Sequence, residues 1–332
     1  MKEKYNLLLK KAEKEKTIEK KMERYQEAMD YAHEKEYYIE SYEAAMILMN
    51  LYVENGDYDY FEDKFLYCLD LYDSNDDIFY PHYIMWKFKE YIEHVDKTPF
   101  ITLEELEQLY EDITQRFTKL NYSLRPIYLF KANVYLRRGE MDLAREWFEK
   151  FEQAEVDDMN DCEACEANAS IDFLMQKDPK KAQEIIRQIL SGELTCGSIP
   201  HLTYSKVLVQ KHQEGNVEEA MEMHQKGYEF VKQSKAFVSE IAVHLDFLVE
   251  VDIHTAFDVF NENLAIVEES CNYHGKFLFY VAAIKLKRKA KEKGILLYNF
   301  PKDIEEVVGI LAEEFDERNG NDHYSRKINP NT

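Results

Sequence analysis

The sequence has few residues that interrupt helices and no long apolar run. Ten glycines and seven prolines among 332 residues, with 45% hydrophobic residues, argue against a collagen-like repeat, a disordered linker and a turn-rich β-sandwich. No apolar run approaches the roughly 18 residues that a membrane-spanning helix needs, and lysines and glutamates interrupt the start of the chain. We therefore expect a compact or solenoidal helical protein with neither a membrane span nor a secretion signal.

Cysteine and positive charge are also scarce. Five scattered cysteines are an odd number and too few to crosslink a chain of this length, which favours reduced thiols and a cytoplasmic location. The 42 basic and 65 acidic residues give a net charge of −23. A chain this acidic is not expected to neutralise nucleic-acid phosphates or to lie on an anionic membrane. We expect no nucleic-acid partner and no membrane partner.

Turn signals divide the sequence into helical hairpins. Residues 55–57, 138–140, 177–179 and 214–216 each lie between two stretches with apolar residues at helical spacing. A small residue recurs in the second stretch of successive pairs, because two helices approach closely only where a small side chain faces a large one. These residues lie 38, 38 and 36 residues apart and are Ala144, Ala182, Ala220 and Ala256. The period predicts an all-α solenoid of helical hairpins.

One hairpin carries a recognisable pattern. Tyr128 and Ala132 mark its first helix, Gly139 its turn, and Ala144 and Phe148 its second helix. This order of aromatic, small residue, turn glycine, alanine and aromatic resembles the tetratricopeptide repeat (TPR). The resemblance implies a right-handed superhelix. We expect charged N-terminal helices as a cap at 1–40, TPR-like repeats at 41–270, a C-terminal capping hairpin at 271–318 and a frayed tail at 319–332. Thr102 and Glu105 have the spacing of a capping box that opens a helix.

The resemblance also indicates where a ligand would bind. In TPR proteins the first helix of each pair lines a concave groove, and asparagine can both donate to and accept from the backbone of an extended peptide. Aligning the hairpins places polar and apolar residues along this groove. The predicted peptide-binding residues are Asn50, Asn133, Asn168, Lys206, Leu129, Leu136, Ile171 and Val209.

Three of these residues allow a narrower interpretation. Asn133, Asn168 and Lys206 resemble part of the carboxylate clamp with which some TPR domains hold a peptide C-terminus. Two further basic positions of that clamp fall on Leu129 and Leu202, so the likeness is partial. A peptide groove of another kind and ordinary solvated polar residues remain open alternatives.

The length, the irregular hairpins and the tyrosine-rich helices are similar to those of the cytoplasmic peptide-pheromone receptors of Gram-positive bacteria. That similarity implies a bacterial protein whose inward asparagines hold a short signalling peptide. Residues 1–40 are too short and too uniformly charged for the helix-turn-helix domain with which many such receptors begin. A change in superhelical pitch would then be the readout of binding.

No spacing in the sequence predicts catalysis, a cofactor or a metal site. The phosphate-binding glycine loop, the zinc-protease helix motif and the serine nucleophile elbow are all absent. Cys162 and Cys165 have C-x-x-C spacing, and Cys196 or His201 could approach them from the next hairpin, but small packing residues are the favoured interpretation. His224 and His244 fall on packing stripes, so we expect core or rim residues.

These observations favour a non-enzymatic protein- or peptide-binding adaptor or regulator, with a signalling-peptide sensor as one form. The alternative is an acidic inhibitor or immunity protein that covers a basic enzyme such as a nuclease toxin, because a charge of −23 would speed association with it. The sequence leaves open whether the chain forms a homodimer.

Overall fold

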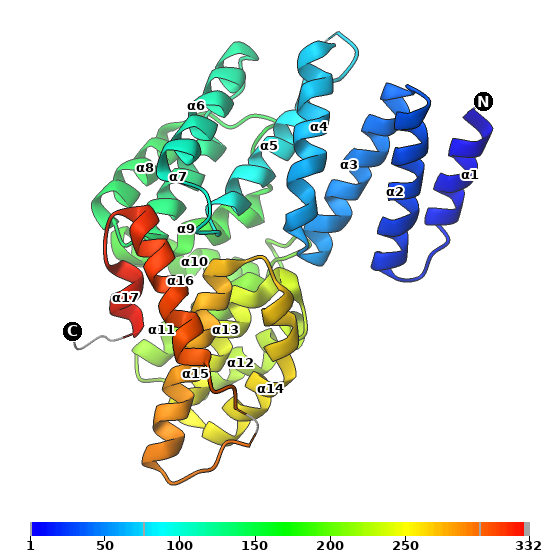
Figure 1. The fold of residues 1–332 in the computed structure, drawn as a ribbon. Helices are drawn as coiled ribbons and strands as arrows, with labels where there is room; N and C mark the ends of the chain where they lie inside the picture. The colour runs from blue at the N-terminus through cyan, green and yellow to red at the C-terminus, as the bar shows by residue number, and fades with distance from the viewer. Residues whose placement is uncertain (1, 76, 299, 329–332) are drawn as a thin grey trace. The chain divides into compact units, whose positions relative to one another are not determined.

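The chain is all-α in the computed structural model, which describes residues 2–75, 77–298 and 300–328. Those residues form 17 α-helices and two short 3-10 turns, with no strand longer than the isolated pair Cys196–Ile199 (Figure 1). The chain divides into two compact units, Met1–Val95 and Asp96–Thr332. None of the helices in the described part is both long enough and apolar enough to cross a bilayer.

The first unit is a run of helices in which each packs against the next. Gly56, with a φ of 74°, ends the third helix, and its left-handed conformation is one that glycine adopts without strain. Phe61 takes the place of the small residue in this unit, and its buried ring stacks near Phe65 and Tyr91. The helices are α1 (Lys2–Ala12), α2 (Ile18–Glu34), α3 (Tyr38–Asn55), α4 (Phe61–Ser74) and α5 (Pro81–Val95).

The second unit contains the predicted succession of hairpins. Gly139 and Gly215, both with a φ of 79°, lie in the turns of two of them, as the turn signals predict. The helices are α6 (Leu103–Lys119), α7 (Arg125–Arg137), α8 (Met141–Gln153), α9 (Glu163–Lys177), α10 (Pro179–Leu190), α11 (His201–Gln213), α12 (Val217–Val231), α13 (Val238–Val251), α14 (Ile253–Glu269), α15 (Tyr273–Glu292), α16 (Ile304–Asn319) and α17 (His323–Ile328).

Small residues allow the hairpins of this unit to close. The four alanines that set the period lie on α8, α10, α12 and α14, and each is 0% exposed. Their burial confirms the predicted packing of paired helices. The capping box at the start of α6 is also confirmed, because Thr102 accepts from the Glu105 backbone N–H and Glu105 accepts from that of Thr102.

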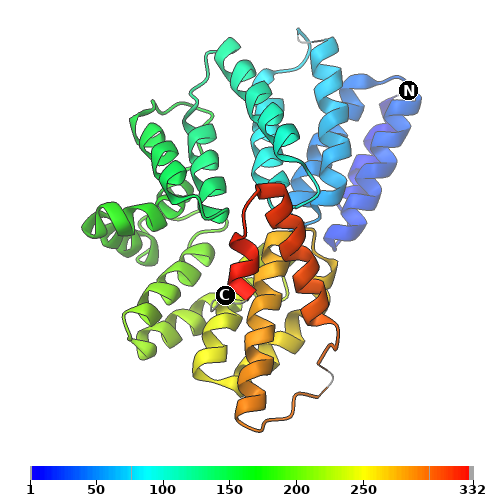
Figure 2. The ribbon, with the colours of Figure 1, turned by 60° about the vertical axis from the view of Figure 1, so that its left-hand side comes forward.

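The C-terminal segment differs from the sequence prediction. The expectation of a frayed tail at 319–332 is wrong for residues 323–328, which form α17. Tyr324 is 1% exposed and stacks on Phe315 with ring centroids 4.3 Å apart, so burial of one aromatic ring holds the segment. Residues 329–332 lie outside the described residues. Figure 2 shows α16 beside α15, with α17 folded back from its end.

Candidate functional site

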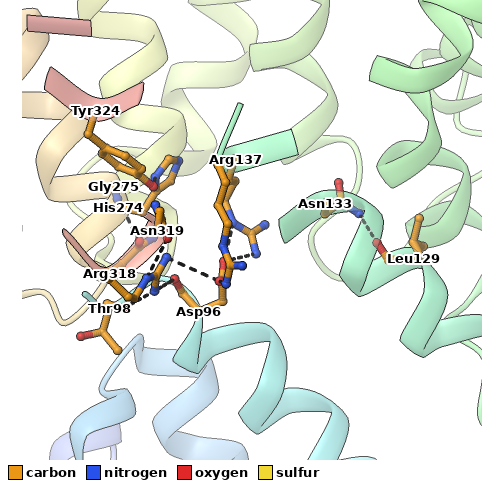
Figure 3. Close-up of polar contacts among 12 residues, drawn as sticks. Asp96, Thr98, Leu129, Asn133, Arg137, His274, Gly275, Arg318, Asn319 and Tyr324 are labelled. Carbon is orange, nitrogen blue, oxygen red and sulfur yellow. Dashed lines mark hydrogen bonds and ion pairs between the residues drawn. The ribbon is translucent and has the colours of Figure 1, made fainter. Parts of the chain in front are cut away.

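The two asparagines that anchor the predicted groove differ in their contacts. Asn50, on α3 of the first unit, is exposed and accepts a hydrogen bond from Lys87 Nζ. Asn133, on α7 of the second unit, is half-buried, and its Nδ2 donates to the carbonyl of Leu129 at 2.9 Å (Figure 3). That bond within the helix leaves Asn133 Oδ1 with no hydrogen-bond partner among the described residues.

Three predicted groove residues belong to the core, so their assignment to an exposed lining is wrong. Asn168 is 5% exposed, Leu129 3% and Ile171 2%. Asn168 faces α11, where it accepts from Thr203 Oγ1 at 2.8 Å. Leu129 and Ile171 join the hydrophobic clusters of their hairpins. The sequence pattern of one hairpin does not show which of its residues the next hairpin will cover. The stacking of the hairpins buries these three residues.

The remaining predicted residues stay accessible to different degrees. Val209 on α11 is 38% exposed, and Leu136 on α7 is half-buried. Lys206, also on α11, forms an ion pair with Asp172 of α9, and the two side chains are 22% and 44% exposed. A carboxylate ligand would therefore have to replace Asp172 as the partner of Lys206.

A buried charge cluster that the sequence did not indicate lies where the second unit begins. Asp96, with a side chain 1% exposed, accepts from Arg137 Nη2 at 2.9 Å (Figure 3). It also accepts from Arg138 Nη2 at 3.0 Å. Arg318 of α16 lies with its Nη2 3.6 Å from Asp96 Oδ1. Its Nη1 also donates to the carbonyls of Asp96 and Thr98, at 2.9 and 2.6 Å.

This cluster holds more positive than negative charge. Burial alone would raise the pKa of Asp96, but the three guanidiniums outweigh it and hold that pKa well below the usual range. Burial lowers the pKa of Arg318, while the Asp96 carboxylate outweighs burial at Arg137 and raises its pKa. Three cations thus share one carboxylate, and the buried Arg138 Nε has no hydrogen-bond partner in the described part of the chain.

Further hydrogen bonds join the start of the second unit to its C-terminal helices. His274 of α15 donates its backbone N–H to the Lys97 carbonyl at 2.9 Å, and its ring Nδ1 lies 2.9 Å from the Tyr324 hydroxyl. Asn321 donates to the Arg138 carbonyl at 3.2 Å. The segment between α16 and α17 therefore contacts the C-cap residue that ends α7.

Two histidines expected in the core or at its rim are buried. His224 is 6% exposed and His244 0%, and their Nδ1 atoms lie 3.2 Å apart. Burial lowers the pKa of His224 to about 4 and that of His244 to about 3. Both rings are neutral at neutral pH, with the proton on one Nδ1 donated to the other.

Three cysteines form the one group of potential metal ligands found in the described residues. The sulfur atoms of Cys162, Cys165 and Cys196 all lie within 4.8 Å of one another. The sequence allowed Cys196 to approach the C-x-x-C pair, and the structure places it there. His201 does not join the group, and its ring lies 4.4 Å from that of Phe230.

Known proteins add no assignment to these sites. A scan against protein-family models finds no match to the chain, and a search of curated proteins finds none either. The contacts, burial and charges of the described residues are therefore what a functional proposal can rest on.

Proposed function

We propose that this chain is a non-enzymatic adaptor or regulator that binds a peptide or a protein segment along the first helices of its TPR-like hairpins. The observation that carries the proposal is the mixture of accessible polar and apolar side chains on α7 and α11. They include the amide of Asn133, the ammonium group of Lys206 and the apolar side chain of Val209. A ligand can take the place of Asp172 as the partner of Lys206. An extended peptide needs these three kinds of partner.

The chemistry of α7 suits backbone recognition. Asn133 Oδ1 is free to accept from a peptide N–H, and half-buried Leu136 lies nearby on the same helix. On α11, Lys206 can exchange Asp172 for a carboxylate of the ligand, because surface ion pairs contribute little individually. Exposed Val209 lies three residues further along.

The position of Asn133 also favours a regulatory role. Arg137 follows it by one helical turn and binds the buried Asp96. A ligand that shifts this turn of α7 would act on the contacts that tie α16 to the start of the unit. Binding would then change the docking of the C-terminal helices, and that change would be the readout of a sensor.

A displayed library of random peptides, selected on the immobilised full-length protein, tests the proposal. Peptides selected on the wild type are expected to lose binding to Asn133→Ala and to Val209→Asp. Leu143→Asp is the matched control, because Leu143 is also 38% exposed but lies on α8, the second helix of its hairpin. If the peptides bind all three variants equally well, α7 and α11 are not part of the binding surface.

The net charge of −23 supports one alternative, an inhibitor or immunity protein that covers a basic enzyme. The two functions differ in their response to salt. Association steered by net charge weakens steeply between low and high ionic strength, whereas binding through a mainly neutral surface weakens little. Affinity for a selected peptide that is insensitive to salt, together with no inhibition of basic nucleases, favours the peptide-binding function.

A further inference from the structure

Two of the clustered cysteines come from one hairpin of the second unit, and the third comes from the segment that connects it to the next hairpin. Cys162 is the N-cap residue of α9, and Cys165 lies in the first turn of that helix. Cys196 comes from the segment between α10 and α11, where its backbone forms two hydrogen bonds of 3.3 Å with Ile199. Packing of the hairpins brings its sulfur to 3.1 Å from that of Cys165.

The spacing of the sulfur atoms fits a shared metal ion. Zinc binds thiolates at about 2.3 Å, so two ligands of a tetrahedral site lie about 3.8 Å apart. The three sulfurs, all within 4.8 Å of one another, reach that spacing with small side-chain rotations. A disulfide would need a separation of about 2.05 Å and would use only two of the three thiols. Convergence of all three favours metal binding.

Two of the three thiols lie at the N-terminus of a helix. The positive end of the α9 dipole favours a negative sulfur at Cys162 and Cys165. Metal binding would release the thiol protons.

The three cysteines differ in exposure, and an ion can reach the cluster from solvent past the exposed one. Cys162 is exposed, while Cys165 and Cys196 are half-buried. Because His201 does not join the group, the residues that the structure describes supply three ligands, which leaves one tetrahedral position to solvent.

We propose that Cys162, Cys165 and Cys196 bind a zinc ion through three thiolates, with the fourth coordination position taken by water or by an external ligand. The ion would tie the N-terminus of α9 to the segment that leads into α11. Asn168 contacts Thr203 between these same two helices, so zinc would fix the spacing of two neighbouring hairpins. The proposal does not depend on peptide binding.

Zinc and cobalt titrations of the reduced, chelator-treated full-length protein test the site. We expect one Zn²⁺ per chain in competition with a chromophoric chelator, and a Co²⁺ spectrum with a thiolate charge-transfer band and tetrahedral d–d bands. Cys162→Ser and Cys196→Ser are each expected to lower zinc affinity on the order of a hundredfold or more. Serine is a favourable N-cap residue, so Cys162→Ser removes a ligand without endangering the fold.

Cys68→Ala is the control, because Cys68 is a buried cysteine of the first unit. It is expected to keep one zinc per chain. The proposal is overturned if the wild type binds no zinc after reduction, if both serine variants bind zinc as tightly as the wild type, or if Cys68→Ala loses zinc as they do. A Cys165–Cys196 disulfide found by mass spectrometry, with no zinc binding once it is reduced, would identify a redox pair instead.

Discussion

Replacing Asp96 with asparagine is expected to destabilise the second unit strongly. Asp96 is the one carboxylate within the cluster of three guanidiniums, and the side chains of Asp96, Arg138 and Arg318 are 1%, 4% and 3% exposed. Removing one partner of a buried ion pair costs about 3 to 5 kcal/mol, because it leaves charge buried without compensation. Asparagine can still accept one of the hydrogen bonds, so we expect a loss of about 3 kcal/mol.

Urea unfolding followed by tryptophan fluorescence measures this loss. The chain has two tryptophans, Trp86 in the first unit and Trp147 on α8 in the second, so a Trp86→Phe background reports the second unit alone. Asp112→Asn is the control, because Asp112 pairs with Arg116 at the surface, where the side chains are 42% and 23% exposed. That pair is expected to contribute less than about 1 kcal/mol.

The dependence on pH gives a second readout of Asp96→Asn. The folded-state pKa of Asp96 lies below its ordinary value near 4, so its stabilisation is present above that value and is lost as pH falls below it. The difference between wild type and variant is therefore expected to stay constant from pH 7.5 to pH 5. A loss for Asp96→Asn no larger than that for Asp112→Asn, or a difference that shrinks well above pH 5, would refute the assignment of a buried, ionised Asp96.

Four further substitutions test other contacts of the second unit by the same urea assay. The pKa of His224 is lowered from 6.5 to about 4, so the stability gained from keeping this ring neutral is fully present above pH 6.5. About 2 kcal/mol of the free energy of unfolding is lost by pH 5 as the ring gains a proton on unfolding. His224→Gln is expected to flatten this pH dependence. An unchanged pH dependence would contradict its burial as a neutral ring. Ala144→Leu is expected to cost about 1 to 3 kcal/mol by forcing α7 and α8 apart, and a neutral effect would contradict the 0% exposure of Ala144. Gly139 and Gly215 share a φ of 79°, but a Cβ at Gly139 would lie 2.3 Å from His323 of α17 whereas one at Gly215 meets nothing within 4 Å. Gly139→Ala is therefore expected to cost more than Gly215→Ala, and equal losses would argue against the docking of α17 on the turn after α7.

Local features of the hairpins could be predicted because they depend on short-range chemistry. Ala144 and the three alanines that repeat its position are buried because paired helices approach closely only at small side chains. Small residues therefore recur at fixed intervals in the sequence. Gly139 adopts a left-handed conformation because the end of a helix favours one, and Thr102 caps α6 through a partner three residues away. The all-α class follows from such periodic patterns alone.

The candidate binding residues could be predicted only in part. The position of Asn133 on α7 follows from the alignment of the hairpins with one another. The burial of Asn168, in contrast, depends on Thr203, which belongs to the next hairpin. The same alignment of hairpins predicts that Leu129 and Ile171 line the groove, but both lie in the core. A single hairpin's pattern specifies its own inner stripe, and it does not specify which further positions the neighbouring hairpins cover.

The sequence by itself determined the elements of this protein: helices, their turns, and the small residues where they pair. Only the tertiary structure decided which distant groups meet, because Arg318 reaches Asp96 across 222 residues and Cys196 reaches Cys165 across 31. Helical periodicity records contacts within a few turns of the chain, whereas such long-range contacts are set by how successive hairpins stack. Both the charge cluster and the three-cysteine site arise from that stacking.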